Sequence, residues 1–311
     1  MGKIAYLFAG QGAQHAGIGQ AFYDASPAAR EILDAAEAMR PGTLDQCFNG
    51  DKTTLSNTVN TQPCLFAVDL ACAAAAREAG IPMHAAAGFS LGEVAAAAFT
   101  DMISFKEAFR LVLRRAETMQ ACADMHPGAM VAVLKLDNDT ISSVCAEFDE
   151  AWPVNYNSPG QTVVACAADV LAPLSDRIKA AGGRAMRLNV SGGFHTPWMQ
   201  PATDALAEML TGISLAAPSV PLYANRTALP YAAETAAETL AKQASSPVRW
   251  TDTIRNMISD GVNTFIEFGP GNTLTGLVRR IAPEATALNA EDPEGLKKCL
   301  EALAAKEAAN A

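Results

Sequence analysis

One serine of this chain stands in surroundings that favour covalent chemistry. Residues 88–92 read GFSLG, a G-x-S-x-G pattern centred on Ser90, with an apolar alanine run before it and a helix-forming run after it. A strand, a tight turn and a helix in this order form a nucleophile elbow. The elbow would present Ser90 at the carboxyl end of a sheet and at a helix N-terminus, where free N–H groups favour negative charge. A serine in an ordinary strand–helix turn is the alternative.

A serine hydroxyl needs a base within hydrogen-bond reach, and the chain offers four histidines. His84 precedes the elbow strand at its far end, His126 lies in a Pro/Gly hinge, and His15 follows the first glycine-rich turn. His195 lies in SGGFHTP, where the chain returns from a smaller unit to a larger one, and clefts form at such borders. By elimination we predict His195 as the base; a hinge histidine that caps a turn is the alternative.

The acid of a serine triad is not visible between Ser90 and His195. No Asp or Glu there stands in a comparably marked loop, so the order serine, acid, histidine cannot be read from the sequence. A backbone carbonyl or an amide side chain could fix the imidazole tautomer instead. We therefore expect a dyad.

Two further features could serve acyl transfer. The first strand ends in FAGQG at residues 8–12, which lacks the third glycine and distal acid of a dinucleotide site. The same loop can lend an N–H to an oxyanion hole, beside the N–H of Leu91.

Arg114 and Arg115 point about 100° apart on an amphipathic helix, so one can face the core. A buried arginine that faces a cleft would select a substrate with a carboxylate, which it can bind through two parallel hydrogen bonds. The alternative is that both arginines are solvent-exposed.

Strands and helices alternate along most of the chain. We expect strands at residues 4–9, 220–224 and 264–268, and helices at 27–39, 62–79, 105–123, 272–281 and 295–308. Residues 127–190 instead follow the order βαββαβ, which is typical of a ferredoxin-like unit. The predicted fold is α/β: a large, mainly parallel core from residues 1–126 and 191–311, with a small inserted subdomain at 127–190. A single continuous sheet is the alternative.

The composition excludes several classes of protein. A net charge of −10 argues against a nucleic-acid partner, because phosphate contacts need a basic face. No run of 18 uncharged apolar residues predicts a membrane span, and the N-terminus reaches a glycine-rich turn too early for a signal peptide. The seven cysteines are scattered without a C-x-x-C, so we expect neither a metal site nor a disulfide framework, and a cytoplasmic location fits best.

Taken together, the motifs resemble those of the malonyl-CoA:acyl carrier protein transacylase family along nearly the whole chain. FAGQG looks like that family's F-P-G-Q-G, GFSLGE at residues 88–93 looks like its G-H-S-L-G-E, and Arg115 with Met119 matches its arginine helix. Further similar segments follow in the same order: GAM at 128–130, NYNSPGQ at 155–161, PVRW at 247–250 and FGPG at 268–271. Two departures are Phe89 in place of histidine and Ala9 in place of proline.

The resemblance implies a role for each matching residue. Ser90 would accept the acyl group, His195 would be its base and Gln243 would orient the histidine. Gln11 and Leu91 would form the oxyanion hole, and Arg115 would hold the malonyl carboxylate. Further positions match pocket-lining residues: Gln62, Asn155, Asn157 and Phe194, the last resembling the malonyl-selecting form of related polyketide acyltransferase domains. The implied fold is an α/β-hydrolase-like core with a ferredoxin-like insert.

The implied activity is transfer of malonyl from malonyl-CoA to the phosphopantetheine thiol of holo acyl carrier protein, through a malonyl-serine, for fatty acid or polyketide synthesis. No metal, other cofactor, nucleic acid or membrane is expected, and family analogy suggests a monomer. Alternatives are the malonyl transferase subunit of a malonate decarboxylase, a serine esterase or thioesterase, and a non-catalytic carrier-binding module.

Acyl carrier proteins are acidic, so an acidic enzyme should dock them on a local basic patch. The candidate positions are Lys179, Arg184, Arg187, Arg279 and Arg280. A solvated surface is the alternative for each of them.

Overall fold

Two separate sheets organise the computed structural model, which describes residues 2–188, 190 and 192–310. The larger sheet has five parallel strands in the order β7-β2-β1-β8-β9. Their bounds are β1 Lys3–Phe8, β2 Ala85–Gly88, β7 Leu222–Tyr223, β8 Val262–Phe268 and β9 Thr286–Ala290. The mainly parallel core expected from the sequence is thereby confirmed.

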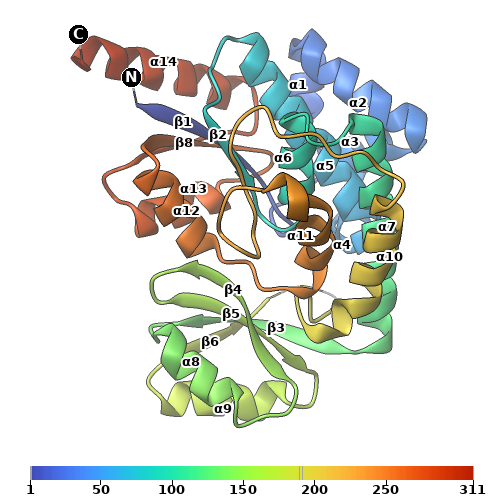
Figure 1. Cartoon of the computed structure of the whole chain (residues 1–311), viewed down its shortest axis with the longest axis vertical. Helices are drawn as coiled ribbons and strands as arrows, with labels where there is room; N and C mark the ends of the chain where they lie inside the picture. Colours follow the sequence, from blue (N-terminus) through green and yellow to red (C-terminus); the bar gives the residue numbers. More distant parts are fainter. Residues whose placement is uncertain (1, 189, 191, 311) are drawn as a thin grey trace.

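Helices cover both faces of this sheet (Figure 1). Alternate residues of β1 separate the two layers: Ile4, Tyr6 and Phe8 belong to the larger hydrophobic cluster, and Ala5 and Leu7 to a smaller one. Strands buried on both faces are typical of parallel sheets. The helices that contribute to the larger cluster are α1 Gln20–Ala25, α2 Pro27–Met39, α3 Thr43–Asn49, α4 Lys52–Ser56, α5 Thr58–Glu78, α6 Leu91–Phe99, α7 Phe105–Met125, α10 Gln200–Leu210, α11 Ala236–Lys242 and α14 Pro293–Asn310. Those that contribute to the smaller one are α12 Trp250–Ser259 and α13 Thr273–Ile281.

Helix α5 forms the centre of the larger cluster. Asn57 caps its first turn by accepting a hydrogen bond from the Val59 N–H at 3.2 Å, so the helix begins before residue 62, where we expected it. By length and composition α5 could cross a membrane, but 89% of its apolar window is buried inside the structure. Helix α5 is therefore buried in the way that a core helix is.

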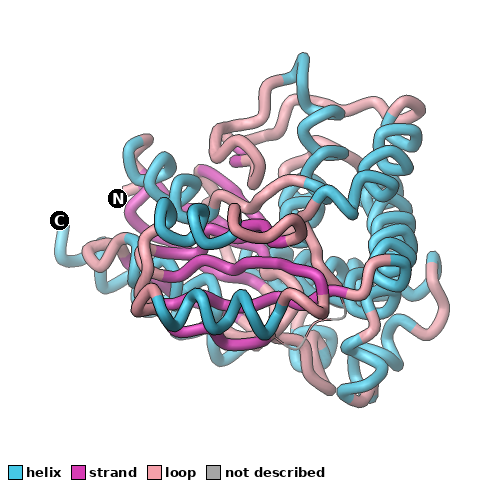
Figure 2. The backbone as a smooth tube through the Cα atoms, turned by 90° about the horizontal axis from the view of Figure 1, so that it is seen from below, coloured by secondary structure: helices cyan, strands magenta, loops and turns pink. Residues whose placement is uncertain are grey.

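The smaller sheet is antiparallel, with the order β4-β5-β3-β6. Its strands are β3 Gly128–Leu134, β4 Ala151–Ser158, β5 Gln161–Ala167 and β6 Arg184–Arg187, joined by α8 Asn138–Cys145 and α9 Leu171–Ala180. The element order is the expected βαββαβ, and helix lies over the strands in the view from below (Figure 2). The expected strand at 184–190 ends at Arg187, and residue 189 lies outside the described residues.

Backbone contacts join the smaller sheet to the larger part. Val248 donates to the Val154 carbonyl at 2.8 Å and accepts from the Tyr156 N–H at 2.9 Å, which forms an isolated parallel bridge to β4. One face of the small sheet packs on α8 and α9, and the other contributes residues such as Met130 and Val163 to the large cluster. We propose residues 127–190 as a subdomain on this basis, with its inner face fixed to the core.

Candidate active site

The turn between β2 and α6 has the backbone of a nucleophile elbow. Ser90 adopts φ 54° and ψ −106°, a conformation that non-glycine residues rarely hold. A Cβ on Gly88 would lie 1.9 Å from the Gly92 backbone, and one on Gly92 would lie 2.2 Å from the Phe8 carbonyl oxygen. Both glycines are therefore required for β1, β2 and α6 to approach one another.

His195 is the histidine that contacts the serine. Its Nε2 lies 2.8 Å from Ser90 Oγ. Its Nδ1 faces two acceptors, the carbonyl oxygens of Gln243 at 3.1 Å and Ser246 at 3.0 Å, so the hydrogen-bond network assigns the proton to Nδ1 and leaves Nε2 as acceptor. Burial and, after it, the charge of Arg115 lower the pKa of His195 to about 4, although the hydrogen bonds to the two carbonyls oppose the shift. The histidine is therefore a neutral base near pH 7.

The backbone of Gln243, and not an acid, fixes the imidazole. The Gln243 side chain has other partners: its Oε1 accepts from Arg115 Nη2 at 2.8 Å and its Nε2 donates to the Ser90 carbonyl. The resemblance pointed to Gln243 but not to Ser246, whose carbonyl also accepts a hydrogen bond from His195 Nδ1. A serine–histidine dyad with two orienting carbonyls is the result.

Arg115 brings a buried positive charge to the serine. The side chain comes from α7, is 1% exposed, and donates from Nη2 to Ser90 Oγ at 3.1 Å. Its Nε and Nη1 have no hydrogen-bond partner among the described residues. Burial lowers the pKa of Arg115 to about 10, opposed by the charge of Glu93. Arg114, by contrast, is solvent-exposed beside Glu117, so the two arginines divide as the helix geometry predicted.

The two N–H groups expected for an oxyanion hole lie beside the elbow. Leu91 is the first residue of α6, and Gln11 lies in the loop after β1. In the described part of the chain, neither backbone N–H donates a hydrogen bond. Gln62 on α5 donates from Nε2 to Gln11 Oε1 at 3.1 Å and thereby holds the loop side chain.

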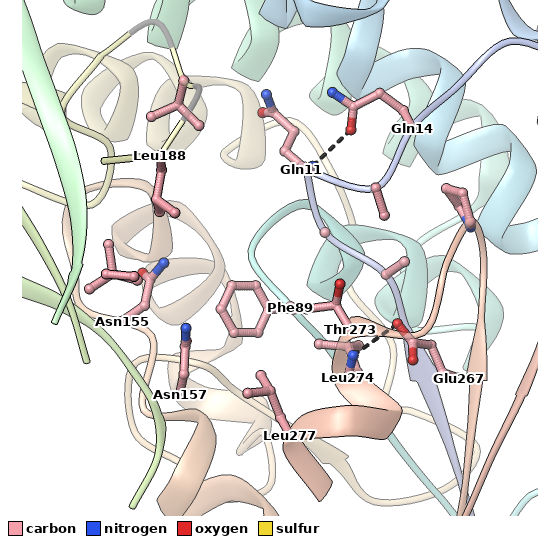
Figure 3. Close-up of a pocket in the computed structure, with 18 of the residues that line it drawn as sticks. Gln11, Gln14, Phe89, Asn155, Asn157, Leu188, Glu267, Thr273, Leu274 and Leu277 are labelled. Carbon is pink, nitrogen blue, oxygen red and sulfur yellow. Dashed lines mark hydrogen bonds between the residues drawn. The ribbon is translucent and has the colours of Figure 1, made fainter. Parts of the chain in front are cut away.

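A cavity of about 520 Å³ opens next to the elbow, between the two sheets. Figure 3 shows Gln11 and Phe89 on one side and Asn155 and Asn157 of β4 on the other. The Oδ1 atoms of both asparagines are buried without a partner among the described residues. Ser90, His195 and Arg115 do not line this cavity themselves, and neither do Gln62 and Phe194, which are buried elsewhere. Phe89 packs edge-on against Trp250, with ring centroids 5.3 Å apart, so it forms an apolar wall of the cavity.

The other three histidines have partners away from the serine. His84 accepts from the Ile4 N–H at 3.1 Å at the far end of the sheet. His126 stacks on Trp198, with ring centroids 5.4 Å apart, and His15 contacts Glu291. In the described residues no group of three or more His, Cys, Asp or Glu side chains is arranged for a metal ion, and the seven cysteines are buried and free.

Sequence reasoning missed Asn225 and gave Glu93 no role. Asn225 Oδ1 accepts from the Ser90 N–H at 2.7 Å, and its Nδ2 donates to the Gly88 carbonyl at 2.6 Å. Glu93 is fully buried on α6, where burial raises its pKa to about 7. Glu93 was visible as the last letter of GFSLGE, whereas no sequence signal marked Asn225.

A parallel α/β sheet that presents a serine, a neutral histidine and a buried arginine at one turn is the arrangement of an enzyme that transfers acyl groups through serine. The acyl transferase domain model matches residues 5–294. The chain belongs to the malonyl CoA-acyl carrier protein transacylase family and is an acyltransferase.

Relatives and solved structures agree on this family. The chain is 36% identical to the malonyl CoA-acyl carrier protein transacylase of Bacillus subtilis, covering 97% of this chain and 98% of the relative. It is 34% identical to that of Escherichia coli K12, covering 97% and 100%. The structure of the Clostridium perfringens transacylase superposes with a TM-score of 0.94 at 34% identity over 99% of both chains. A malonyl-transacylase solved in complex with a type II polyketide synthase acyl carrier protein superposes with a TM-score of 0.91 at 35% identity, covering 96% of this chain and 99% of that one.

Proposed function

We propose that this enzyme moves a malonyl group from malonyl-CoA to the phosphopantetheine thiol of an acyl carrier protein, supplying fatty acid or polyketide synthesis. The observation that carries the proposal is a buried Arg115 with two unpartnered donors, 3.1 Å from the hydroxyl of the serine nucleophile. A buried cation with spare donors calls for an anionic ligand, because an unpaired buried charge is costly. A malonyl thioester carries a carboxylate two carbons from the reacting carbonyl.

In the loading half-reaction, His195 Nε2 takes the proton from Ser90 Oγ as the oxygen attacks the thioester carbonyl. The tetrahedral oxyanion accepts hydrogen bonds from the Gln11 and Leu91 N–H groups. When the C–S bond breaks, the proton on His195 passes to the coenzyme A sulfur. The products are malonyl-Ser90 and coenzyme A.

In the transfer half-reaction the carrier's thiol gives its proton to His195 and attacks the malonyl-serine ester. Collapse of the second tetrahedral intermediate returns the proton to Ser90 Oγ and releases malonyl-carrier. The Arg115 guanidinium holds the carboxylate through both steps. Phe194, the residue before His195, packs near the malonyl group. Gln62 supports the Gln11 loop, and Asn155 and Asn157 offer buried amides in the cavity to the arm of either thioester.

The first test is intact-protein mass spectrometry after brief mixing with malonyl-CoA or acetyl-CoA. We expect a malonyl adduct on the wild type, no adduct on Ser90→Ala, and discharge of the adduct by holo acyl carrier protein. Free malonate without an adduct would favour an esterase or thioesterase. Discharge only by the carrier of a malonate decarboxylase would assign the enzyme to that system, and absence of both adduct and turnover would favour a carrier-binding module.

The proposed partners are malonyl-CoA and holo acyl carrier protein, with no further cofactor. The complex of a similar transacylase with its carrier supports the second partner. We also propose a cytoplasmic monomer; light scattering on the purified protein tests the oligomeric state.

A further inference from the structure

The strained elbow is bridged by a single amide side chain from the loop after β7, the strand that pairs with β2. Asn225 Oδ1 accepts from the Ser90 N–H at 2.7 Å, and Asn225 Nδ2 donates to the Gly88 carbonyl at 2.6 Å. The two bonds fall on either side of Phe89, so the amide spans the whole turn. No other described side chain bonds both ends of the elbow in this way.

Asn225 is itself held from three directions. It follows β7, which pairs with β2, and is 1% exposed. Its N–H donates to Glu93 Oε1 at 3.2 Å, and its carbonyl accepts from the Arg249 N–H at 2.9 Å. Tyr231 donates to the same Glu93 oxygen at 2.6 Å. Because Glu93 lies one turn after Ser90 on α6, it ties the Asn225 loop to the helix that the elbow begins.

The Ser90 N–H needs this external acceptor. Ser90 precedes the first residue of α6, so no carbonyl of that helix can accept from it. A residue at φ 54° keeps its conformation only when the surrounding contacts determine it. If the turn relaxed, Ser90 Oγ would move away from His195 Nε2 at 2.8 Å, and a misplacement of about 1 Å costs about 10²-fold in rate.

We propose that Asn225 is a positioning residue: its amide holds the elbow so that Ser90 Oγ meets His195 Nε2, and Glu93 fixes Asn225 in turn. The inference rests on the proposed function, in which Ser90 accepts the acyl group. It concerns a residue that never touches the substrate and acts through the backbone of the nucleophile.

The test is single-turnover loading of Asn225→Ala, followed by quenched-flow mass spectrometry of the malonyl-serine. We expect the loading rate constant to fall about 10²-fold while half-saturation by malonyl-CoA stays within about twofold. Asn256→Ala is the matched control, because Asn256 Nδ2 donates to the Ala228 carbonyl at 2.9 Å in the same loop without touching the elbow. Equal slowing of both variants would overturn the inference, since it would reflect a loosened loop. A wild type that forms no adduct would instead defeat the proposed function.

Asn225→Asp provides a readout that a merely structural role would not change, and it replaces the alanine variant should that fail to fold. A protonated Asp keeps an acceptor for the Ser90 N–H and a donor for the Gly88 carbonyl, whereas a carboxylate repels that carbonyl. Burial raises the pKa of such a carboxyl group. We therefore expect loading by Asn225→Asp to speed up, as the pH falls from about 8 to about 6, by more than loading by the wild type, in which Glu93, with a pKa of about 7, changes its charge over the same range. A pH profile of Asn225→Asp parallel to that of the wild type would refute the positioning role.

Discussion

At the scale of single residues, acyl selectivity should reside in Arg115. Replacing it by alanine removes the buried cation that we expect to pair with the malonyl carboxylate. Hydrogen bonds to charged groups contribute about 1.5–3 kcal/mol, so malonyl loading should fall about 10²-fold while acetyl loading improves relative to it. The measurement is the ratio of kcat/KM for malonyl-CoA and acetyl-CoA. Arg114→Ala, on the exposed face of the same helix, is the control and should leave the ratio of kcat/KM values unchanged. An unchanged ratio for Arg115→Ala would show that Arg115 is only structural.

The buried imidazole predicts an unusual pH dependence. Because burial lowers the pKa of His195 to about 4, the base stays neutral through the acid range where a solvated histidine protonates near 6.5. Protonation of His195 should therefore slow single-turnover loading only near about pH 4, whereas Glu93, with a pKa of about 7, is the buried group beside the elbow that changes its charge nearer neutrality. Quenched loading at a series of pH values measures this. An apparent pKa near 6.5 in the loading rate of both the wild type and Glu93→Gln would mean that solvent reaches the histidine.

The same shift affects stability, with a definite sign. The folded pKa lies below the unfolded one, so the unfolded chain takes up the proton first as the pH falls. The contribution of neutral His195 is present above about 6.5 and is lost as the pH falls toward about 4. Denaturation of the wild type and His195→Gln at both ends of this range should show a steeper loss of unfolding free energy for the wild type.

At the scale of elements, the elbow depends on close backbone packing. A Cβ on Gly92 would lie 2.2 Å from the Phe8 carbonyl, so Gly92→Ala must separate α6 from β1. Overpacking of this kind costs about 1–3 kcal/mol, and we expect a lower Tm together with loss of loading. Gly276→Ala is the matched control, because the helical Gly276 on α13 has no atom within 4 Å of a new Cβ. That variant should gain about 0.5–1 kcal/mol, and Gly92→Ala with an unchanged Tm would contradict the packing argument.

Periodicity alone found many of the elements but not all of them. Strands β1 and β8 and helices α2, α5, α7 and α13 have strong patterns that the sequence revealed. Strand β7, Leu222–Tyr223, lies within the strand expected at residues 220–224, whereas β9 reads TALNA with a mixed burial pattern and was not expected. Strand β9 carries no local signal, because its pairing with β8 defines it. Helices α10, α11 and α12 were not expected either.

The site shows the same division between local and distant contacts. Ser90 and its glycines were predictable because four neighbouring positions determine the turn. Ser246 and Asn225 were not, since 51 residues separate His195 from the first and 135 separate Ser90 from the second. Gln243 came only from the resemblance, which did not say that its backbone orients the histidine and its side chain bonds Arg115.

At the scale of the whole molecule, the basic residues proposed for carrier docking form two separate groups. Lys179, Arg184 and Arg187 lie on α9 and β6, at one edge of the small sheet. Arg279 and Arg280 lie on α13, which packs against β4 at the opposite edge. These five residues therefore do not form a single patch, and we propose that the carrier docks on one of the two groups.

The α13 group is the better placed of the two for an incoming phosphopantetheine arm. Arg280 contacts Gln161, and both Gln161 and the α13 residues Leu274 and Leu277 line the cavity beside the elbow. An acidic carrier on Arg280 would thus have its arm at the cavity mouth. Lys179, Arg184 and Arg187 do not line this cavity, although Leu188, the residue after β6, does.

Charge reversal can separate docking from chemistry. We expect Arg280→Glu to raise KM for holo acyl carrier protein about tenfold, because opposite charges steer association, and to weaken its dependence on salt. Loading of Ser90 by malonyl-CoA should be unchanged, since this half-reaction needs no carrier. Arg184→Glu, an equal charge reversal at the far edge of the small sheet, is the control and should leave KM for the carrier near the wild-type value. If Arg184→Glu raises that KM and Arg280→Glu does not, the carrier docks on the α9–β6 edge and its arm must reach the serine by another path.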